Sequence, residues 1–201
     1  KRFRDFKDAL RKDVKNRARL CREEIEFVLA REDDCGVLMK QLEEGILPLR
    51  VTHNDTKLNN ILFDKNTGEG LCIIDLDTIM PGLAANDFGD SIRFGASTAE
   101  EDEKDLNKVH FDIELYRIYV KGYLEMAKDV LTPAENASLP WGARLMTLEC
   151  GMRFLADFLQ SDVYFKTTYP EHNLVRARTQ FRLVKEMEEQ FDQMQEIVET
   201  F

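Results

Sequence analysis

The spacing of apolar residues predicts that helices make up most of the chain. Through most of the 201 residues, apolar positions recur every three or four residues, as on the buried face of a helix. One helix should start at Thr132-Pro133-Ala134-Glu135, because threonine caps helices well and proline fits their first turn. The periodic segments are residues 3 to about 32 with a break near Asn16, 35 to 44 ended by Gly45, 86 to 94 capped by Asn86 or Asp87, 105 to 128, 141 to 160 and 171 to 199.

A different pattern occupies the stretch between residues 47 and 75. Residues 47–52 read as an extended segment, and residues 61–63 and 71–74 are short apolar runs separated by the turn sequence 64–68. Together they predict a small β-hairpin, which should be buried because nearly all of its strand residues are apolar. The expected fold class is α+β and mostly helical, with residues 1–201 forming one unit.

Composition and charge narrow the classes of function. Apolar residues make up 43% of the chain, enough for a sizeable core, and the formal net charge is −10. An acidic surface repels phosphate groups, so we expect neither a nucleic acid nor a membrane as partner. No apolar run approaches the length of a membrane span, and the four cysteines fit no zinc or C-x-x-C spacing. Unpaired cysteines indicate a reducing compartment, so we expect a cytoplasmic protein.

The loop before the predicted hairpin, residues 53–60, carries the pattern His-x-Asp-x-x-x-x-Asn. Phosphoryl transfer needs a carboxylate that orients and deprotonates the acceptor hydroxyl, and Asp55 would supply it. It also needs oxygen ligands for Mg²⁺, and Asn60 would supply one. Lys57 lies between them and could meet the transferring phosphate. Asp and Asn are common in loops simply because they form turns, but that alternative explains single residues better than the whole set.

The loop after the hairpin offers a second carboxylate. Asp75 directly follows an apolar strand and lies 20 residues after Asp55, enough chain for a hairpin to bring the two together. Two carboxylates and an amide at one place would favour Mg²⁺. Asp77 could take a second metal ion or merely solvate the loop, and the sequence leaves both open.

A later segment, Asp87-Phe88-Gly89, spells the metal-binding motif of protein kinases. We do not assign the metal to it, because residues 81–86 are expected to be a loop and no strand precedes it. Asp87 and Asp90 are instead expected to cap a helix or to anchor the catalytic loop by hydrogen bonds.

These motifs resemble the aminoglycoside-phosphotransferase and choline-kinase superfamily, although its members more often have glycine where this chain has Asn54. That superfamily has a protein-kinase-like fold. Longer strings are similar to one branch, the N-acetylhexosamine 1-kinases, and the similarity runs from about Phe3 onward. The strings are residues 51–60, 74–82, 87–95, 149–157 and 169–176.

The resemblance implies ATP-dependent phosphorylation of the anomeric hydroxyl of N-acetylglucosamine or N-acetylgalactosamine, with Mg²⁺ as cofactor. Asp55 would be the catalytic base, and Asn60 and Asp75 would bind the metal. His53 would support the loop from within and take no part in the chemistry.

The same resemblance implies that Arg153 and Tyr164 would face the sugar. Arginine can donate to an acyl oxygen or to ring hydroxyls. The alternatives are a surface or ion-paired helical arginine and an aromatic side chain that only packs its loop.

Kinases of this fold hold ATP with an N-terminal lobe that contains a sheet, a phosphate-binding loop and a Lys–Glu pair. The chain has no G-x-G-x-x-G, and its only close glycine pair, Gly68 and Gly70, lies on the hairpin turn. We therefore expect residues 1–201 to be the C-terminal lobe, with a nucleotide-binding lobe as its partner. Two rival functions remain: a kinase of the same fold acting on an aminoglycoside, choline or homoserine, and a kinase-derived binding module without catalysis.

Overall fold

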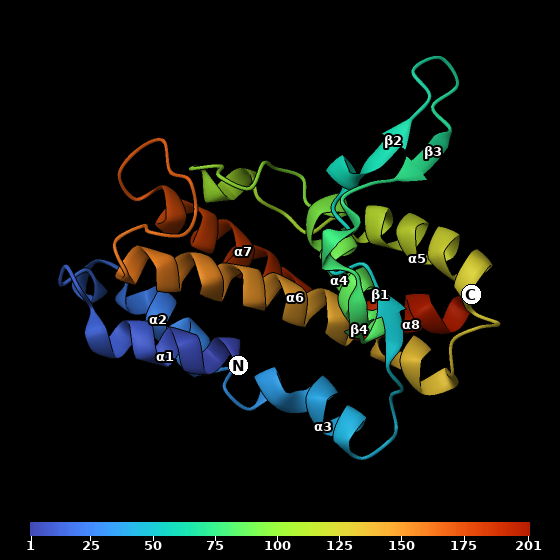
Figure 1. The fold of residues 1–201 in the computed structure, drawn as a ribbon, viewed down its shortest axis with the longest axis horizontal. Coiled ribbons are helices and arrows are strands. Elements are labelled where there is room, and N and C mark those ends of the chain that lie inside the picture. Colours follow the sequence, from blue (N-terminus) through green and yellow to red (C-terminus); the bar gives the residue numbers. More distant parts are fainter.

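A computed structural model describes residues 1–201 and contains eight α-helices and four short strands (Figure 1). The chain is mostly helical, as its periodicity predicts. The helices are α1 (Arg2–Lys12), α2 (Arg22–Leu29), α3 (Val37–Glu43), α4 (Ala84–Gly95), α5 (Ile113–Ala127), α6 (Pro133–Leu159), α7 (His172–Glu189) and α8 (Phe191–Thr200), and the strands are β1 (Arg50–Thr52), β2 (Ile61–Phe63), β3 (Gly70–Ile73) and β4 (Met80–Gly82).

Helix α6 runs through the middle of the molecule and contacts α1, α4, α7 and α8 (Figure 1). Its start is the predicted one: Thr132 and Glu135 form a reciprocal capping box, and Pro133 occupies the first turn. The helix continues through Pro140, so the predicted start and the predicted helix at 141–160 belong to one element. Buried packing on several sides outweighs the hydrogen bond that the proline removes.

Two large apolar clusters, one at each end of α6, and a third of four residues form the core. The first joins α1 and α2 to the C-terminal part of α6 and the start of α7, and the second joins α4, α5 and α8 to the N-terminal part of α6. Helices α4 and α6 cross very closely, because a Cβ atom on Gly89 would overlap the backbone carbonyl of Gly142. This crossing fixes α4 in place, and α4 carries the residues that hold the site.

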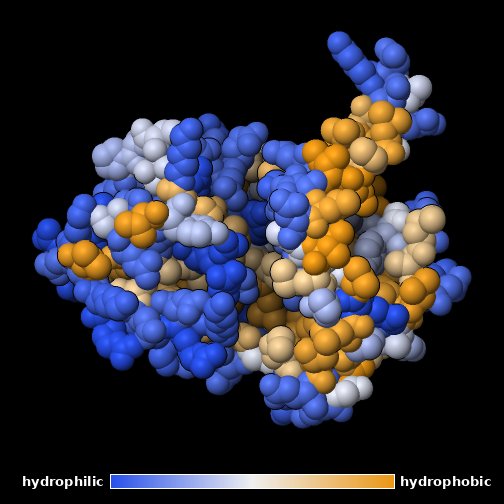
Figure 2. All heavy atoms as spheres, viewed as in Figure 1, coloured by the Kyte–Doolittle hydropathy of each residue, from blue (hydrophilic) through white to orange (hydrophobic).

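The predicted hairpin forms, but the prediction that it is buried is wrong. Strands β2 and β3 pair antiparallel and project from the helical body (Figure 1). Leu62, Phe63, Leu71 and Ile73 expose 46–62% of their surface. The apolar strands cannot bury each other in a two-stranded ribbon, and no helix of the chain covers them. Figure 2 shows that the hydrophobic surface of the hairpin continues onto the same side of the helical body.

The structure also corrects several boundaries. Residues 80–82 form strand β4, which pairs antiparallel with β1, so a strand does precede Asp87. Helix α4 has Leu83 as its N-cap, so neither Asn86 nor Asp87 caps it. Such short strands are set by long-range pairing and not by a local pattern.

Two helix ends differ as well. Helix α5 begins at Ile113, capped by Asp112, and not near residue 105, where only a short 3₁₀ turn forms. The predicted last helix is divided at Gln190 into α7 and α8. None of the helices combines the length and the apolar character needed to cross a membrane.

Candidate active site

The loop of residues 53–60 follows β1 and is held by carboxylates of α4. The Asp87 carboxylate accepts the backbone N–H groups of His53 and Asn54, both at 2.7 Å, and the Asp90 carboxylate accepts the N–H of Thr56 at 3.0 Å. Burial raises the pKa of Asp87, and the two N–H groups partly offset this effect. Because the two aspartates are three residues apart on a helix, both face the loop.

Asn54 gives the loop its sharp bend. Its backbone lies in the left-handed region, with φ +65°, which asparagine and glycine tolerate better than other residues. Its side-chain amide donates to the carbonyls of Thr52 and Thr78 at 3.1 and 3.0 Å. Asparagine can therefore stand where the superfamily more often has glycine, and it also ties the loop before the hairpin to the one after it.

Asp55, Lys57 and Asn60 come together at the bottom of this loop. Asp55 Oδ2 accepts hydrogen bonds from Lys57 Nζ and Asn60 Nδ2, both at 2.8 Å, and the same Asn60 nitrogen donates to the Asp55 carbonyl at 2.8 Å. Partial burial raises the pKa of Asp55, but the hydrogen bonds from Lys57 and Asn60 outweigh it, and the net pKa is lowered. Asp55 is therefore ionised at neutral pH, as a proton acceptor must be.

The chain after β3 returns beside the loop. The N–H of Ile74 donates to the Asn60 carbonyl at 2.9 Å, and His53 Nε2 donates to the Ile74 carbonyl at 3.0 Å. The Thr78 hydroxyl donates to the His53 carbonyl at 2.6 Å. His53 thus connects the two loops, while its buried Nδ1 has no hydrogen-bond partner. These bonds bring Asp75, the next residue, close to the backbone of Asn60.

The donor set at this place fits Mg²⁺. Asn60 uses its amide nitrogen on Asp55, which leaves its amide oxygen free as a ligand. Asp75 is exposed, its backbone has φ +62°, and its carboxylate makes no hydrogen bond within the protein. The structure has no cluster of three or more His, Cys, Asp or Glu side chains that could hold a metal alone. One amide and one carboxylate are a typical protein share for Mg²⁺, whose other ligands are substrate phosphates and water.

Asp77 lies in the 3₁₀ turn after Asp75 and is exposed. Its carboxylate makes no hydrogen bond to either loop. Asp90, in contrast, is buried and also pairs with Arg93 at 3.1 Å, and Arg93 pairs with Glu101 at 3.0 Å.

Arg153 and Tyr164 lie side by side, on α6 and on the segment that follows it. The Arg153 guanidinium sits over the rings of Tyr164 and Phe165, with 5.9 and 5.4 Å to their centroids. Arg153 makes no salt bridge within the protein, and its guanidinium contacts only these two rings among the aromatic side chains. The Tyr164 side chain is largely exposed. Burial raises the pKa of the nearby Cys150 thiol to about 12; the charge of Arg153 lowers this pKa and that of Asp90 raises it.

Sequence reasoning missed two residues that line the site. A cavity of about 500 Å³ is lined by Asp55, Lys57 and Asn60 and also by Tyr119 and Tyr123 of α5. Burial and the nearby charge of Asp87 raise the pKa of Tyr123 to about 12, so its hydroxyl stays protonated. The two tyrosines are four residues apart on one helix face, a signal that the sequence contained.

Arg50 also lines this cavity and anchors it. Its guanidinium binds the buried Glu135 carboxylate through two bonds of 2.8 and 2.7 Å, which ties β1 to the start of α6. The hydrogen bond from Arg50 lowers the pKa of Glu135, and burial opposes it. Neither Arg153 nor Tyr164 lines this cavity.

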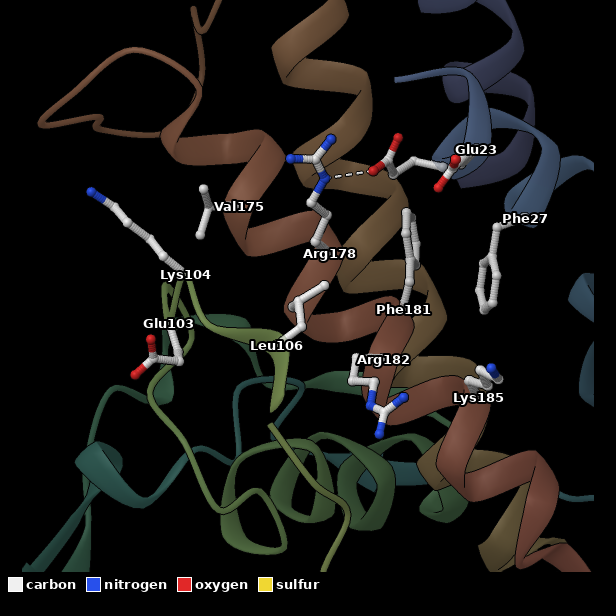
Figure 3. Close-up of a pocket in the computed structure, with 11 residues that line it drawn as sticks. Glu23, Phe27, Glu103, Lys104, Leu106, Val175, Arg178, Phe181, Arg182 and Lys185 are labelled. Atoms are coloured by element: carbon white, nitrogen blue, oxygen red, sulfur yellow. Dashed lines mark hydrogen bonds and ion pairs between the residues drawn. The ribbon is translucent and has the colours of Figure 1, made fainter. Parts of the chain in front are cut away.

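A separate groove of about 510 Å³ lies between α2, residues 103–106 and α7 (Figure 3). None of the predicted site residues lines it. Its three basic residues on α7 are each paired with a carboxylate; Arg178, for example, pairs with Glu24 at 2.5 Å. The loops around Asp55 are therefore the better candidate for chemistry.

One comparison with known proteins bears on this geometry. The model of a family described as the phosphotransferase enzyme family matches residues 1–128 of the chain. The matched part includes both loops, the hairpin, α4 and all of α5. Arg153 and Tyr164 lie outside it.

Proposed function

The chain belongs to the phosphotransferase enzyme family, and on this premise we propose that it is the catalytic lobe of an N-acetylhexosamine 1-kinase. The family indicates a small-molecule kinase that uses ATP. The proposed reaction transfers the γ-phosphoryl group to the anomeric hydroxyl of N-acetylglucosamine or N-acetylgalactosamine. The observation that carries the proposal is the ionised Asp55 carboxylate, bonded to Asn60 and Lys57 on a loop that α4 holds.

In this proposal Asp55 acts as the base. It orients the sugar hydroxyl and accepts its proton while the hydroxyl oxygen bonds to the γ-phosphorus and the bond from phosphorus to the ADP oxygen breaks. Lys57 would leave Asp55 to meet the transferring phosphoryl group. Asn60 and Asp75 would hold Mg²⁺, which when bound neutralises charge on the phosphates.

Arg153 and Tyr164 would hold the sugar. The guanidinium of Arg153 has no ion pair, so its donors are free for an acyl oxygen or ring hydroxyls. The exposed ring of Tyr164 offers an apolar face and a polar tip, a combination suited to a sugar.

We also propose that a nucleotide-binding lobe covers the exposed side of the hairpin. Apolar residues of the hairpin, β1 and β4 form a large exposed surface, which marks an interaction site in soluble proteins. Val51 is 84% exposed and Met80 53%, and both lie close to the candidate site. ATP between such a lobe and the hairpin would place its phosphates near Asn60 and Asp75.

The test is a kinase assay with ATP, Mg²⁺ and either N-acetylhexosamine, with the sugar 1-phosphate detected by phosphorus NMR. The chain joined to a nucleotide-binding lobe should produce it, and the 201-residue chain alone should not. Robust turnover by the chain alone would contradict the proposed lobe.

A substrate panel tests the choice of sugar. Glucose, choline, homoserine and an aminoglycoside should each react far more slowly than the N-acetylhexosamines. Preference for any of them would move the function to another kinase of the family. Loss of Mg²⁺ binding in calorimetry, together with no turnover on any substrate, would favour a binding module.

A further inference from the structure

We propose that Asp157 is a positioning residue that fixes the turn carrying Tyr164 and thereby sets the affinity for the sugar; the sugar part rests on the proposed function. Asp157 lies near the end of α6, 3% exposed. Its carboxylate accepts the backbone N–H groups of Val163, Tyr164 and Phe165 at 3.0, 2.9 and 3.0 Å, and Asn173 Nδ2 at 2.8 Å.

The turn between α6 and Tyr164 is held from outside as well. Ser161 and Asp162 have φ of +79° and +59°, so the chain reverses sharply just before the three N–H groups. Asp162 accepts a hydrogen bond from Asn173 at 3.0 Å and pairs with Arg17 at 2.5 Å. Three segments therefore hold one short turn: the connection between α1 and α2, which carries Arg17, and helices α6 and α7.

A buried carboxylate is costly unless hydrogen bonds replace its lost water, and four donors do so here. What this arrangement fixes is the backbone that carries an exposed group: the Tyr164 side chain is 73% exposed and adds little to the core. Its neighbour Phe165 packs on Phe154 of α6, with ring centroids 4.6 Å apart. The network therefore presents Tyr164 beside the unpaired Arg153 in a fixed position, as a binding surface requires and a stable core does not.

The experiment uses the ¹⁵N-labelled 201-residue chain in three forms: wild type, Asp157→Ala and the control Lys166→Ala. Lys166 lies on the same segment, and only its backbone carbonyl makes a hydrogen bond. Hydrogen exchange of the amides of residues 163–165 reports on the turn, and an NMR titration with N-acetylglucosamine gives the dissociation constant. Asp157→Ala should speed exchange of the three amides and weaken sugar binding, each about tenfold or more, since it removes several bonds to a charged acceptor. Lys166→Ala should change neither.

A double-mutant cycle separates positioning from general damage. Tyr164→Ala should weaken sugar binding by itself. Adding Asp157→Ala should then cause little further loss, because Asp157 acts through Tyr164. A further tenfold loss would overturn the inference. If Asp157→Ala does not fold, Asp157→Asn, which keeps an acceptor oxygen, carries the same comparison with a smaller expected loss.

The outcomes distinguish this inference from the proposed function. If the wild-type chain binds no N-acetylglucosamine, the proposed substrate fails, and the exchange rates alone decide whether Asp157 fixes the turn. Faster exchange with an unchanged dissociation constant would overturn the link to the sugar and leave the proposed function intact. Unchanged exchange in Asp157→Ala would overturn the inference itself.

Discussion

The two loops of the candidate site differ in what holds them. The loop with Asp55 is bound to α4 through Asp87 and Asp90, and α4 is locked against α6 where Gly89 meets Gly142. The loop with Asp75 is held by hydrogen bonds to the first loop, and it follows an exposed hairpin that contacts little of the core.

This difference indicates separate roles for the two loops. The groups proposed to handle the acceptor hydroxyl are preorganised by the helical fold, which keeps the cost of reorganisation low during the reaction. Of the two groups proposed to bind the metal, Asn60 belongs to the same rigid loop, whereas Asp75 follows a hairpin whose apolar side chains are exposed. Mutations in the core beneath the Asp55 loop should therefore lower stability. Mutations in the hairpin or the Asp75 loop should lower activity and leave stability nearly unchanged.

The largest effect is expected at Asp55. Asp55→Asn keeps the shape but removes the base, so the turnover number of the two-lobe kinase should fall by about 10²–10⁴-fold. The dissociation constant for the sugar, measured by NMR titration, should change little. Asn59→Ala is the control, because Asn59 is exposed on the same loop and its side chain makes no hydrogen bond. A nearly unchanged turnover number would show that Asp55 is not the base.

The next effect probes the crossing beneath the rigid loop. Gly89→Ala should lower the free energy of unfolding by about 3 kcal/mol, since its methyl group would overlap the backbone of α6. Gly122→Ala on α5 is the matched control, because nothing lies within 4 Å of an added Cβ there. It should raise stability by about 0.5–1 kcal/mol. Urea unfolding measures both, and equal losses would contradict the close crossing.

A third comparison contrasts the two loops directly. Asp87→Ala should cost about 2 kcal/mol of stability, because two backbone N–H groups lose their acceptor. Asp75→Ala should leave stability within about 0.5 kcal/mol, because its carboxylate has no protein partner. Only Asp75→Ala should shift the Mg²⁺ dependence of turnover to higher concentration while stability is kept. The opposite result would make Asp87 the metal ligand.

The smallest effect is expected on the hairpin. Leu62→Ser should change the free energy of unfolding of the 201-residue chain by no more than about 0.5 kcal/mol, since Leu62 is 46% exposed. Leu155→Ala, in the buried core of α6, should cost about 2–5 kcal/mol in the same assay. If Leu62→Ser also weakens association of the chain with the nucleotide-binding lobe, the proposed cover is supported; unchanged association would count against it.

Much of the fold followed from local pattern. Apolar periodicity predicted the helices, and the Thr132–Glu135 capping box predicted the start of α6, because caps and helix faces depend on neighbours within a few residues. Asp55 and Asn60 could be predicted as site residues for a similar reason. The short loop from Asp55 to Asn60 must bring its polar groups close together, and it does so within 2.8 Å.

Only the tertiary structure decided the rest. Strand β1 pairs with β4, the hairpin is exposed, and Arg50, Tyr119 and Tyr123 line one cavity. Each of these features depends on segments far apart in sequence. The spacing of Tyr119 and Tyr123 shows that they share a helix face, but not which cavity that face lines. The same holds for Asp87. The sequence left open whether Asp87 caps a helix or anchors the catalytic loop, and its position in α4 turns its carboxylate to the backbone of the Asp55 loop. Residue type and spacing determined which groups this protein has for chemistry, and long-range packing decided which of them hold the loops in place.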